Sequence, residues 1–319
     1  MSETEANSDE ILLRRLGFEA KAQALRKSPR VRLKLQPYVS PVQRIVGLVT
    51  MMRLPNCAMI GFAVIVGEVI AAPTVPARAA FYGFMTGFLL LSASMVSNDY
   101  FDREIDAINA PERPLPAGVI KPPEAVSFSI ILAAVGFWFA AGSGTIPLLI
   151  AFLSVLVMLS YNSRIKKTGL LGNALVSTNV AIPFIYGGFA VATPTWSLGI
   201  FSLLAFLSSM GREIVKGIVD VPGDTARGVK SVAATRGNGK AAKYGAALFV
   251  AAVALSGLPL LLRIVSYYYV PLVAICDIGF LLTAYSLLTN PSPANAKRSK
   301  NYVLIWMTFG LLAFVIGTL

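Results

Sequence analysis

The chain has 319 residues, of which 55% are hydrophobic and only 14% are charged, with a formal net charge of +12. Soluble domains carry charge on about a quarter of their residues, so the composition argues against a soluble domain and indicates a polytopic membrane protein. The absence of histidine excludes histidine-dependent catalysis and histidine-ligated metals. The two cysteines, Cys57 and Cys276, lie in separate apolar segments, which excludes a cysteine-based metal site.

The first segment, residues 1–40, is polar and of mixed charge, unlike the chain that follows. It lacks the apolar core and the cleavage site of a secretory signal peptide. We therefore expect a cytoplasmic N-terminal tail that is partly disordered or forms a helix on the surface. The remaining residues, 41–319, predict a single membrane domain.

Apolar blocks of membrane-spanning length recur along residues 41–319, separated by clusters of Gly, Pro, Ser and Asn that are typical of loops. The sequence therefore predicts an all-α protein with nine transmembrane helices. The expected spans are 43–70, 77–101, 124–141, 145–162, 171–191, 196–217, 242–262, 268–289 and 300–318.

The distribution of positive charge predicts how these spans are oriented. With the N-terminus in the cytoplasm, 25 of the 28 Lys and Arg residues fall in the tail or in cytoplasmic loops. Only Arg78 and Arg263 fall on the other side, and Arg53 lies within the first expected span. Such a bias predicts a multi-pass protein of the cell membrane, with its N-terminus and its acidic clusters on the cytoplasmic side.

Two aspartate clusters lie at the cytoplasmic ends of the second and the sixth expected spans. Spacings of three and four residues place the members of a cluster on one helix face. Pro222 and Gly223 argue locally against a continuous helix through the second cluster. The candidate residues are Asn98, Asp99, Asp102 and Asp106 in the first cluster, and Asp220 and Asp224 in the second.

Carboxylates placed so close together repel one another, so we expect a cation between them. Oxygen ligands without His or Cys favour Mg²⁺ or Ca²⁺. Mg²⁺ usually takes one or two carboxylates and completes its shell with water and substrate phosphate. Two acidic clusters that face one cavity would therefore hold a diphosphate between metal ions.

Several cations surround the two clusters and suit a polyanionic ligand. Arg212 and Lys216 precede Asp220 at four-residue steps on the same helix face. An arginine inside a span, here Arg53 with Asn56 three residues later, is by default a functional hypothesis. The other cytoplasmic loops contribute further cations that could reach a phosphate, Lys166, Lys167 and Lys230.

The segment "NDYFDREIDAINAPERPLPAG" closely resembles the first aspartate-rich motif of the UbiA superfamily of intramembrane prenyltransferases, and "DVPGDTARGVKS" resembles the second. "RLPN" in the first expected span and "YNSRIKKTGLLGN" after the fourth also match that family in place and type. The resemblance extends from about residue 43 to the end of the chain. It implies a nine-helix bundle around a central cavity with a cytoplasmic cap.

The resemblance also implies an isoprenyl diphosphate donor held by Mg²⁺ and a lipophilic acceptor in the lipid bilayer. The donor would ionise toward an allylic carbocation and diphosphate, and a dry cavity would shield the cation from water. The implied metal and catalytic residues are the six members of the two clusters. The implied substrate contacts are Arg53, Asn56, Asn98, Tyr161, Lys166, Arg212, Lys216 and Lys230.

The sequence is similar to branches of the family that use different acceptors. "GREIVKGIVDVPGDTARGVKSVA" is most similar to the archaeal branch of digeranylgeranylglyceryl phosphate synthases, which join geranylgeranyl diphosphate to geranylgeranylglyceryl phosphate. "DREIDAIN" is also similar to chlorophyll synthases, and an aromatic quinone precursor is a further alternative. A cation transporter is a remote alternative, because transporters place their carboxylates near the bilayer centre on broken helices.

Overall fold

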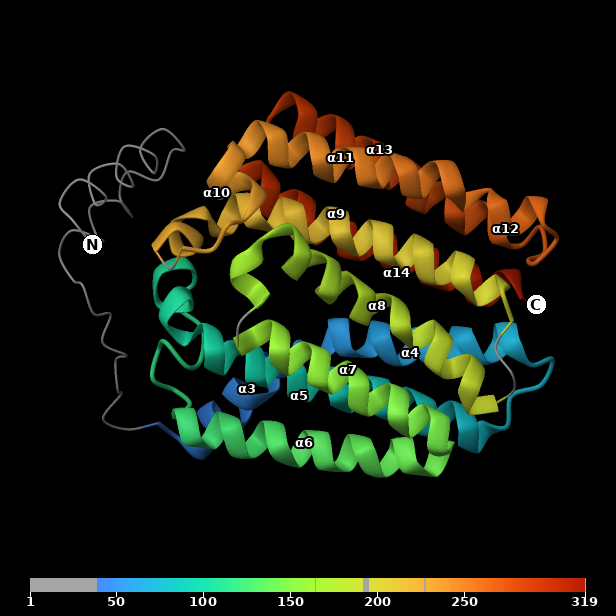
Figure 1. Ribbon diagram of the computed structural model, residues 1–319, viewed down its shortest axis with the longest axis horizontal. Coiled ribbons are helices and arrows are strands. Elements are labelled where there is room, and N and C mark those ends of the chain that lie inside the picture. Colours follow the sequence, from blue (N-terminus) through green and yellow to red (C-terminus); the bar gives the residue numbers. More distant parts are fainter. Residues whose placement is uncertain (1–38, 164, 192–194, 227, 319) are drawn as a thin grey trace.

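The computed structural model describes residues 39–163, 165–191, 195–226 and 228–318 (Figure 1). Every regular element in these ranges is a helix, which confirms the predicted all-α class. The expected tail, 1–40, lies outside the described residues up to residue 38. Its character therefore stays a prediction.

The helices follow the expected spans closely, and the long ones run roughly side by side in the bundle (Figure 1). The elements are α3 (Pro41–Met52), α4 (Leu54–Ala71), α5 (Ala77–Asn109), α6 (Pro122–Ser143), α7 (Thr145–Ser163), η1 (Ile165–Thr168), α8 (Leu170–Val191), α9 (Ser197–Ala226), α10 (Val232–Arg236), α11 (Asn238–Ser256), α12 (Leu258–Leu261), α13 (Tyr269–Thr289) and α14 (Pro293–Gly317).

Within the described part of the chain, eight helices are long and apolar enough to cross a membrane. The remaining expected span, 145–162, corresponds to α7, whose apolar part Thr145–Tyr161 is shorter than the others. The protein is therefore a polytopic membrane protein, and the count of nine spans stays a prediction.

The first expected span, 43–70, is wrong as a single helix. The structure divides it at Arg53, whose backbone is left-handed with φ 56°, into α3 and α4. Pro55 lies in the first turn of α4, where its missing N–H costs nothing, but a helix continuing from α3 would clash with its ring. Arg53 therefore lies at a junction between helices and not inside a transmembrane helix.

The expected interruption at Pro222 and Gly223 is also absent. Helix α9 continues through both residues to Ala226. Ile218 and Val221 on its last turns are buried in one apolar cluster with Val232 of α10. This packing stabilises the helical conformation against the cost of an internal proline.

Helices α4 and α8 approach most closely where each presents a glycine. A Cβ atom on Gly67 would lie 2.2 Å from the carbonyl oxygen of Phe184, and one on Gly187 would lie 2.1 Å from that of Val64. Small residues allow this kind of backbone contact between membrane helices. The two helices form one wall of a cavity of about 320 Å³, to which α5, α6, α7, α9 and α14 also contribute.

We expect Gly187→Ala to destabilise the bundle, because the added methyl group must push α8 away from α4. Overpacking of this kind costs about 1–3 kcal/mol. Thermal unfolding of the purified protein in detergent measures the effect. Gly199→Ala is the matched control, since a Cβ atom on Gly199 of α9 meets nothing within 4 Å. Equal melting temperatures for the two variants would contradict the close packing.

Candidate functional site

The first aspartate cluster forms one buried stripe on the last turns of α5. Asp99, Asp102 and Asp106 are 4%, 6% and 5% exposed. The helix is continuous from Ala77 to Asn109, so the spacings of three and four place them on one face, as predicted. Asn98 joins the stripe, because its side-chain Nδ2 donates a hydrogen bond to Asp102 Oδ2 at 3.0 Å.

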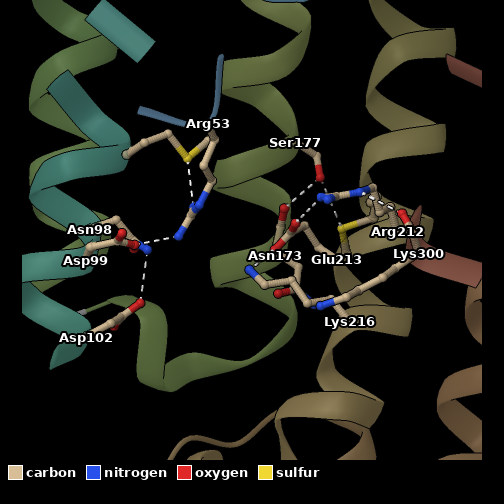
Figure 2. A network of polar contacts seen from close by, with 12 residues as sticks. Arg53, Asn98, Asp99, Asp102, Asn173, Ser177, Arg212, Glu213, Lys216 and Lys300 are labelled. Carbon is tan, nitrogen blue, oxygen red and sulfur yellow. Dashed lines mark hydrogen bonds and ion pairs between the residues drawn. The ribbon is translucent and has the colours of Figure 1, made fainter. Parts of the chain in front are cut away.

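Arg53 reaches this stripe from the junction between α3 and α4. Its Nη2 lies 2.5 Å from Asp99 Oδ1, and its Nη1 lies 2.9 Å from Met95 Sδ (Figure 2). The helix break at Arg53 thus places its side chain against the acidic cluster. The predicted contact of Arg53 with substrate stays a prediction, and its partner in the structure is the carboxylate of Asp99.

A second arginine, Arg113, approaches the same stripe from the loop after α5. Its Nη1 lies 2.6 Å from Asp106 Oδ2 and 3.7 Å from Asp99 Oδ1. Leu115 and Ile120 anchor this loop, because both are buried in an apolar cluster between α3, α5 and α6. The loop therefore holds a guanidinium beside the end of α5.

The ionisation of this pair reflects both burial and charge. Burial raises the pKa of Asp106 to about 6, Arg113 opposes the rise, and the nearby charges of Asp102 and Asp99 add to it. Burial by itself would lower the pKa of Arg113, but the charges of Asp106, Asp99 and Asp220 raise it above its ordinary value. Because the charge of Asp220 contributes to the pKa of Arg113, the second cluster lies close to this arginine.

The second cluster lies on the C-terminal half of α9. Asp224 is buried, Asp220 is half-buried, and Arg212 and Lys216 precede them on the same helix. Glu213 lies between these two cations: Arg212 Nη1 and Lys216 Nζ each donate to one of its carboxylate oxygens at 3.1 Å (Figure 2). Arg212 Nε also donates to the carbonyl oxygen of Lys300 on α14, at 3.2 Å.

Tyr161, a predicted substrate contact, lies near both clusters. This side chain at the end of α7 is only 7% exposed. It lies within electrostatic range of Asp102 on α5 and of Lys216, Glu213 and Asp224 on α9. Helices α5 and α9 are also in direct contact. The structure therefore brings together two motifs that are more than a hundred residues apart in sequence.

The predicted loop cations that the structure describes lie at more exposed positions than Arg212 and Lys216 of α9. Lys167 and Lys230 are exposed, and the side chain of Lys166 lies outside the described part of the structure. Their loops nevertheless meet, because Lys230 donates its backbone N–H to the Lys167 carbonyl oxygen at 3.0 Å. Gly169 has a φ of 72° and leaves no room for a Cβ atom beside the Lys230 carbonyl oxygen.

A mainly apolar cavity begins directly below the charged groups. Asn56, Ser97, Arg212 and Glu213 line it near the clusters, and residues as deep as Tyr186 line its far end. Other lining residues from α4 to α9 and α14 are mostly aliphatic or methionine side chains. A polar mouth above a cavity of about 320 Å³ suits a ligand with an anionic head and a long apolar chain.

Among the described residues, no three acidic side chains lie close enough to form a metal site as they stand. Arg53 and Arg113 bind Asp99 and Asp106 instead. The chemistry of the donors still suits a hard cation, since all six predicted ligands offer oxygen atoms and neither His nor Cys is present among them.

Sequence reasoning missed three residues of this site. Arg113 is not among the predicted substrate contacts, although it lies within "NDYFDREIDAINAPERPLPAG", the segment that resembles the first motif. Glu213 stands between two predicted substrate contacts, Arg212 and Lys216, and its burial depends on packing. Lys300 lies within electrostatic range of Asp220, Lys216 and Arg212, although about eighty residues separate it from the second motif. No local signal marks that proximity.

Comparisons with known proteins agree with this architecture. Residues 60–312 match the UbiA prenyltransferase family. Digeranylgeranylglyceryl phosphate synthase from Methanopyrus kandleri is 34% identical over 83% of the chain and 96% of its own length. The enzyme of the same name from Methanosarcina barkeri is 36% identical, with coverage of 83% and 96%.

Solved structures show the same arrangement of helices. One of a digeranylgeranylglyceryl phosphate synthase is 34% identical, with a TM-score of 0.66 over 86% of this chain and 98% of that one. A UbiA homologue from Aeropyrum pernix K1 reaches a TM-score of 0.72 at 20% identity, covering 83% of this chain and 98% of that one. From its sequence and its fold, the chain belongs to the UbiA prenyltransferase family.

Proposed function

We propose that the protein transfers a geranylgeranyl group from geranylgeranyl diphosphate to geranylgeranylglyceryl phosphate, in a Mg²⁺-dependent reaction that forms digeranylgeranylglyceryl phosphate. The observation that carries the proposal is the pair of acidic clusters, with their cations, above a mainly apolar cavity. The relatives of that name, at 34% to 36% identity over more than four fifths of the chain, support the choice of substrates.

The diphosphate of the donor would bind between the end of α5 and the end of α9. Asp99, Asp102 and Asp106 with Asn98, and Asp220 with Asp224, would hold Mg²⁺ there. When bound, Mg²⁺ stabilises the negative charge that develops on the leaving diphosphate. A UbiA homologue from Archaeoglobus fulgidus has been solved with GPP and Mg²⁺, and it shares the fold at 16% identity and a TM-score of 0.59.

Arg53 and Arg113 suit a site in which the aspartates would exchange an arginine for a metal ion. Arg53 and Arg113 balance the buried charges of Asp99 and Asp106. With Mg²⁺ held by the carboxylates, Arg53 and Arg113 would bind the diphosphate oxygens, for which guanidinium groups are well suited. The chain of the donor would lie in the cavity below, where water is excluded from the allylic cation.

The phosphate of the acceptor would bind on the α9 and α14 side of the mouth. Arg212, Lys216 and Lys300 lie within electrostatic range of one another there. These three cations would bind an anionic acceptor more strongly than a neutral one. An aromatic quinone precursor or chlorophyllide is the alternative acceptor, to be separated by assay.

The charge bias of the loops supports a cytoplasmic position for this site and for the N-terminus. Arg78, Arg263, Tyr267 and Tyr268 belong to the opposite end of the bundle, where exposed tyrosines are typical of a membrane interface. Carboxylates at one end of the bundle, instead of its centre, argue against a cation transporter.

We expect Asp102→Asn to lower product formation by about 10²-fold or more, because the amide removes one charge from the proposed metal and diphosphate site. The measurement is product formation by purified protein with Mg²⁺ and both substrates, alongside thermal unfolding. Glu104→Gln is the matched control, since Glu104 lies on the same helix but is exposed. Unchanged turnover of Asp102→Asn would refute the assignment of the metal site.

The acceptor is tested by offering the purified protein geranylgeranyl diphosphate, Mg²⁺ and one acceptor at a time. The acceptors are geranylgeranylglyceryl phosphate, 4-hydroxybenzoate and chlorophyllide, and mass spectrometry identifies the products. We expect prenylation of geranylgeranylglyceryl phosphate alone, because the mouth of the cavity is rich in cations. Turnover of only an aromatic or tetrapyrrole acceptor would overturn the proposed function but not the family.

The orientation is tested with single cysteines in a variant that lacks Cys57 and Cys276. Lys230→Cys and Tyr268→Cys both place a thiol at an exposed position, at opposite ends of the bundle. We expect a membrane-impermeant maleimide to label Tyr268→Cys in intact cells and Lys230→Cys only after the cells are opened. The reverse pattern would show that the site faces outward.

A further inference from the structure

Glu213 occupies an unusual position for a carboxylate in a site that binds anions. It lines the cavity one turn below Lys216, and seven residues, about 10 Å along the helix axis, below Asp220. Ser97 and Met95 of α5 line the same cavity. If the diphosphate lies at the level of Asp220, Glu213 lies where the first carbon atoms of the donor chain enter the cavity.

The side chain is buried, with 8% of its surface exposed, and both carboxylate oxygens are hydrogen-bonded. Arg212 and Lys216 at 3.1 Å stabilise its ionised form, because opposite charges favour the charged state of a carboxylate. A carboxylate here nevertheless weakens the attraction of these cations for a phosphate. That loss requires a compensating function.

Prenyl transfer to a hydroxyl group supplies such a function, because it releases a proton. The bond between the allylic carbon and the diphosphate oxygen breaks, and its electron pair leaves with the diphosphate. The acceptor oxygen then donates an electron pair to the allylic carbon and forms the ether bond. The electron pair of its O–H bond stays on oxygen, and the proton needs a base near the new bond.

We propose that Glu213 is this base and takes the proton from the acceptor hydroxyl as the ether bond forms. The inference rests on the proposed prenyl transfer and adds a catalytic residue to it. Glu213 is an anion in the wall of the cavity, at the level below the clusters, whereas Asp99 and Asp106 belong to the cluster that would hold Mg²⁺ and the diphosphate and do not line the cavity. Arg212 and Lys216 then have two roles, since they orient the carboxylate and attract the acceptor phosphate.

The test is Glu213→Gln, which keeps the size of the side chain and one oxygen acceptor but cannot take the proton. Two products of radiolabelled geranylgeranyl diphosphate are measured: the prenylated acceptor, and the alcohol formed when water traps the allylic cation. We expect the kcat of acceptor prenylation to fall about 10²-fold or more. The KM of the donor and the rate of alcohol formation without acceptor should stay close to those of the unmodified protein.

Glu124→Gln is the matched control, because it removes a carboxylate that pairs with Arg44 away from the cavity. Glu213→Asp keeps the carboxylate but shortens its reach, and we expect prenylation between that of the unmodified protein and that of Glu213→Gln. The aspartate variant also provides the test if the glutamine variant does not fold.

Two results would overturn the proposal. Full prenylation by Glu213→Gln would mean that another group, such as the departing diphosphate, takes the proton. An equal fall in prenylation and in alcohol formation would mean that Glu213 serves binding or folding only. The assay uses whichever acceptor the unmodified protein prenylates, so failure of the proposed acceptor is seen separately from failure of Glu213 as the base.

Discussion

The arrangement of the site depends on how buried carboxylates are neutralised at the end of an apolar bundle. Three aspartates on the last turns of α5 are each less than a tenth exposed. Isolated charges in such surroundings are very costly, so each needs a cation or a hydrogen-bond donor. Arg53 and Arg113 bind Asp99 and Asp106, and Asn98 donates a hydrogen bond to Asp102.

Both arginines lie in irregular backbone segments, which packing against the rest of the fold holds in place. Arg53 adopts a left-handed conformation between two helices, ahead of a proline that begins the second. Arg113 lies in a loop whose Leu115 and Ile120 are buried against neighbouring helices. The apolar packing thus fixes the cations, and the cations in turn allow the aspartates to be buried beside a cavity.

The same balance of charge bears on how one end of the bundle would bind the two anionic substrates of the proposed reaction. The first cluster has more carboxylates than arginines and suits a metal ion with a diphosphate. The side formed by α9 and α14 has Arg212 and Lys216 bound to Glu213, with Lys300 within electrostatic range of both cations, and suits a phosphate without a metal. In the proposed reaction, this asymmetry would place the donor and the acceptor on different sides of one mouth, with Glu213 between them.

The sequence by itself determined the all-α membrane class, the approximate spans and the two aspartate clusters. These features depend on local periodicity, on long apolar runs and on carboxylate spacing along a single helix. The break at Arg53, the continuity of α9 through Pro222 and the convergence of Arg113, Tyr161 and Lys300 were decided only by the tertiary structure. Each depends on packing between segments far apart in the chain, and the spacing of residues along the sequence does not encode such contacts.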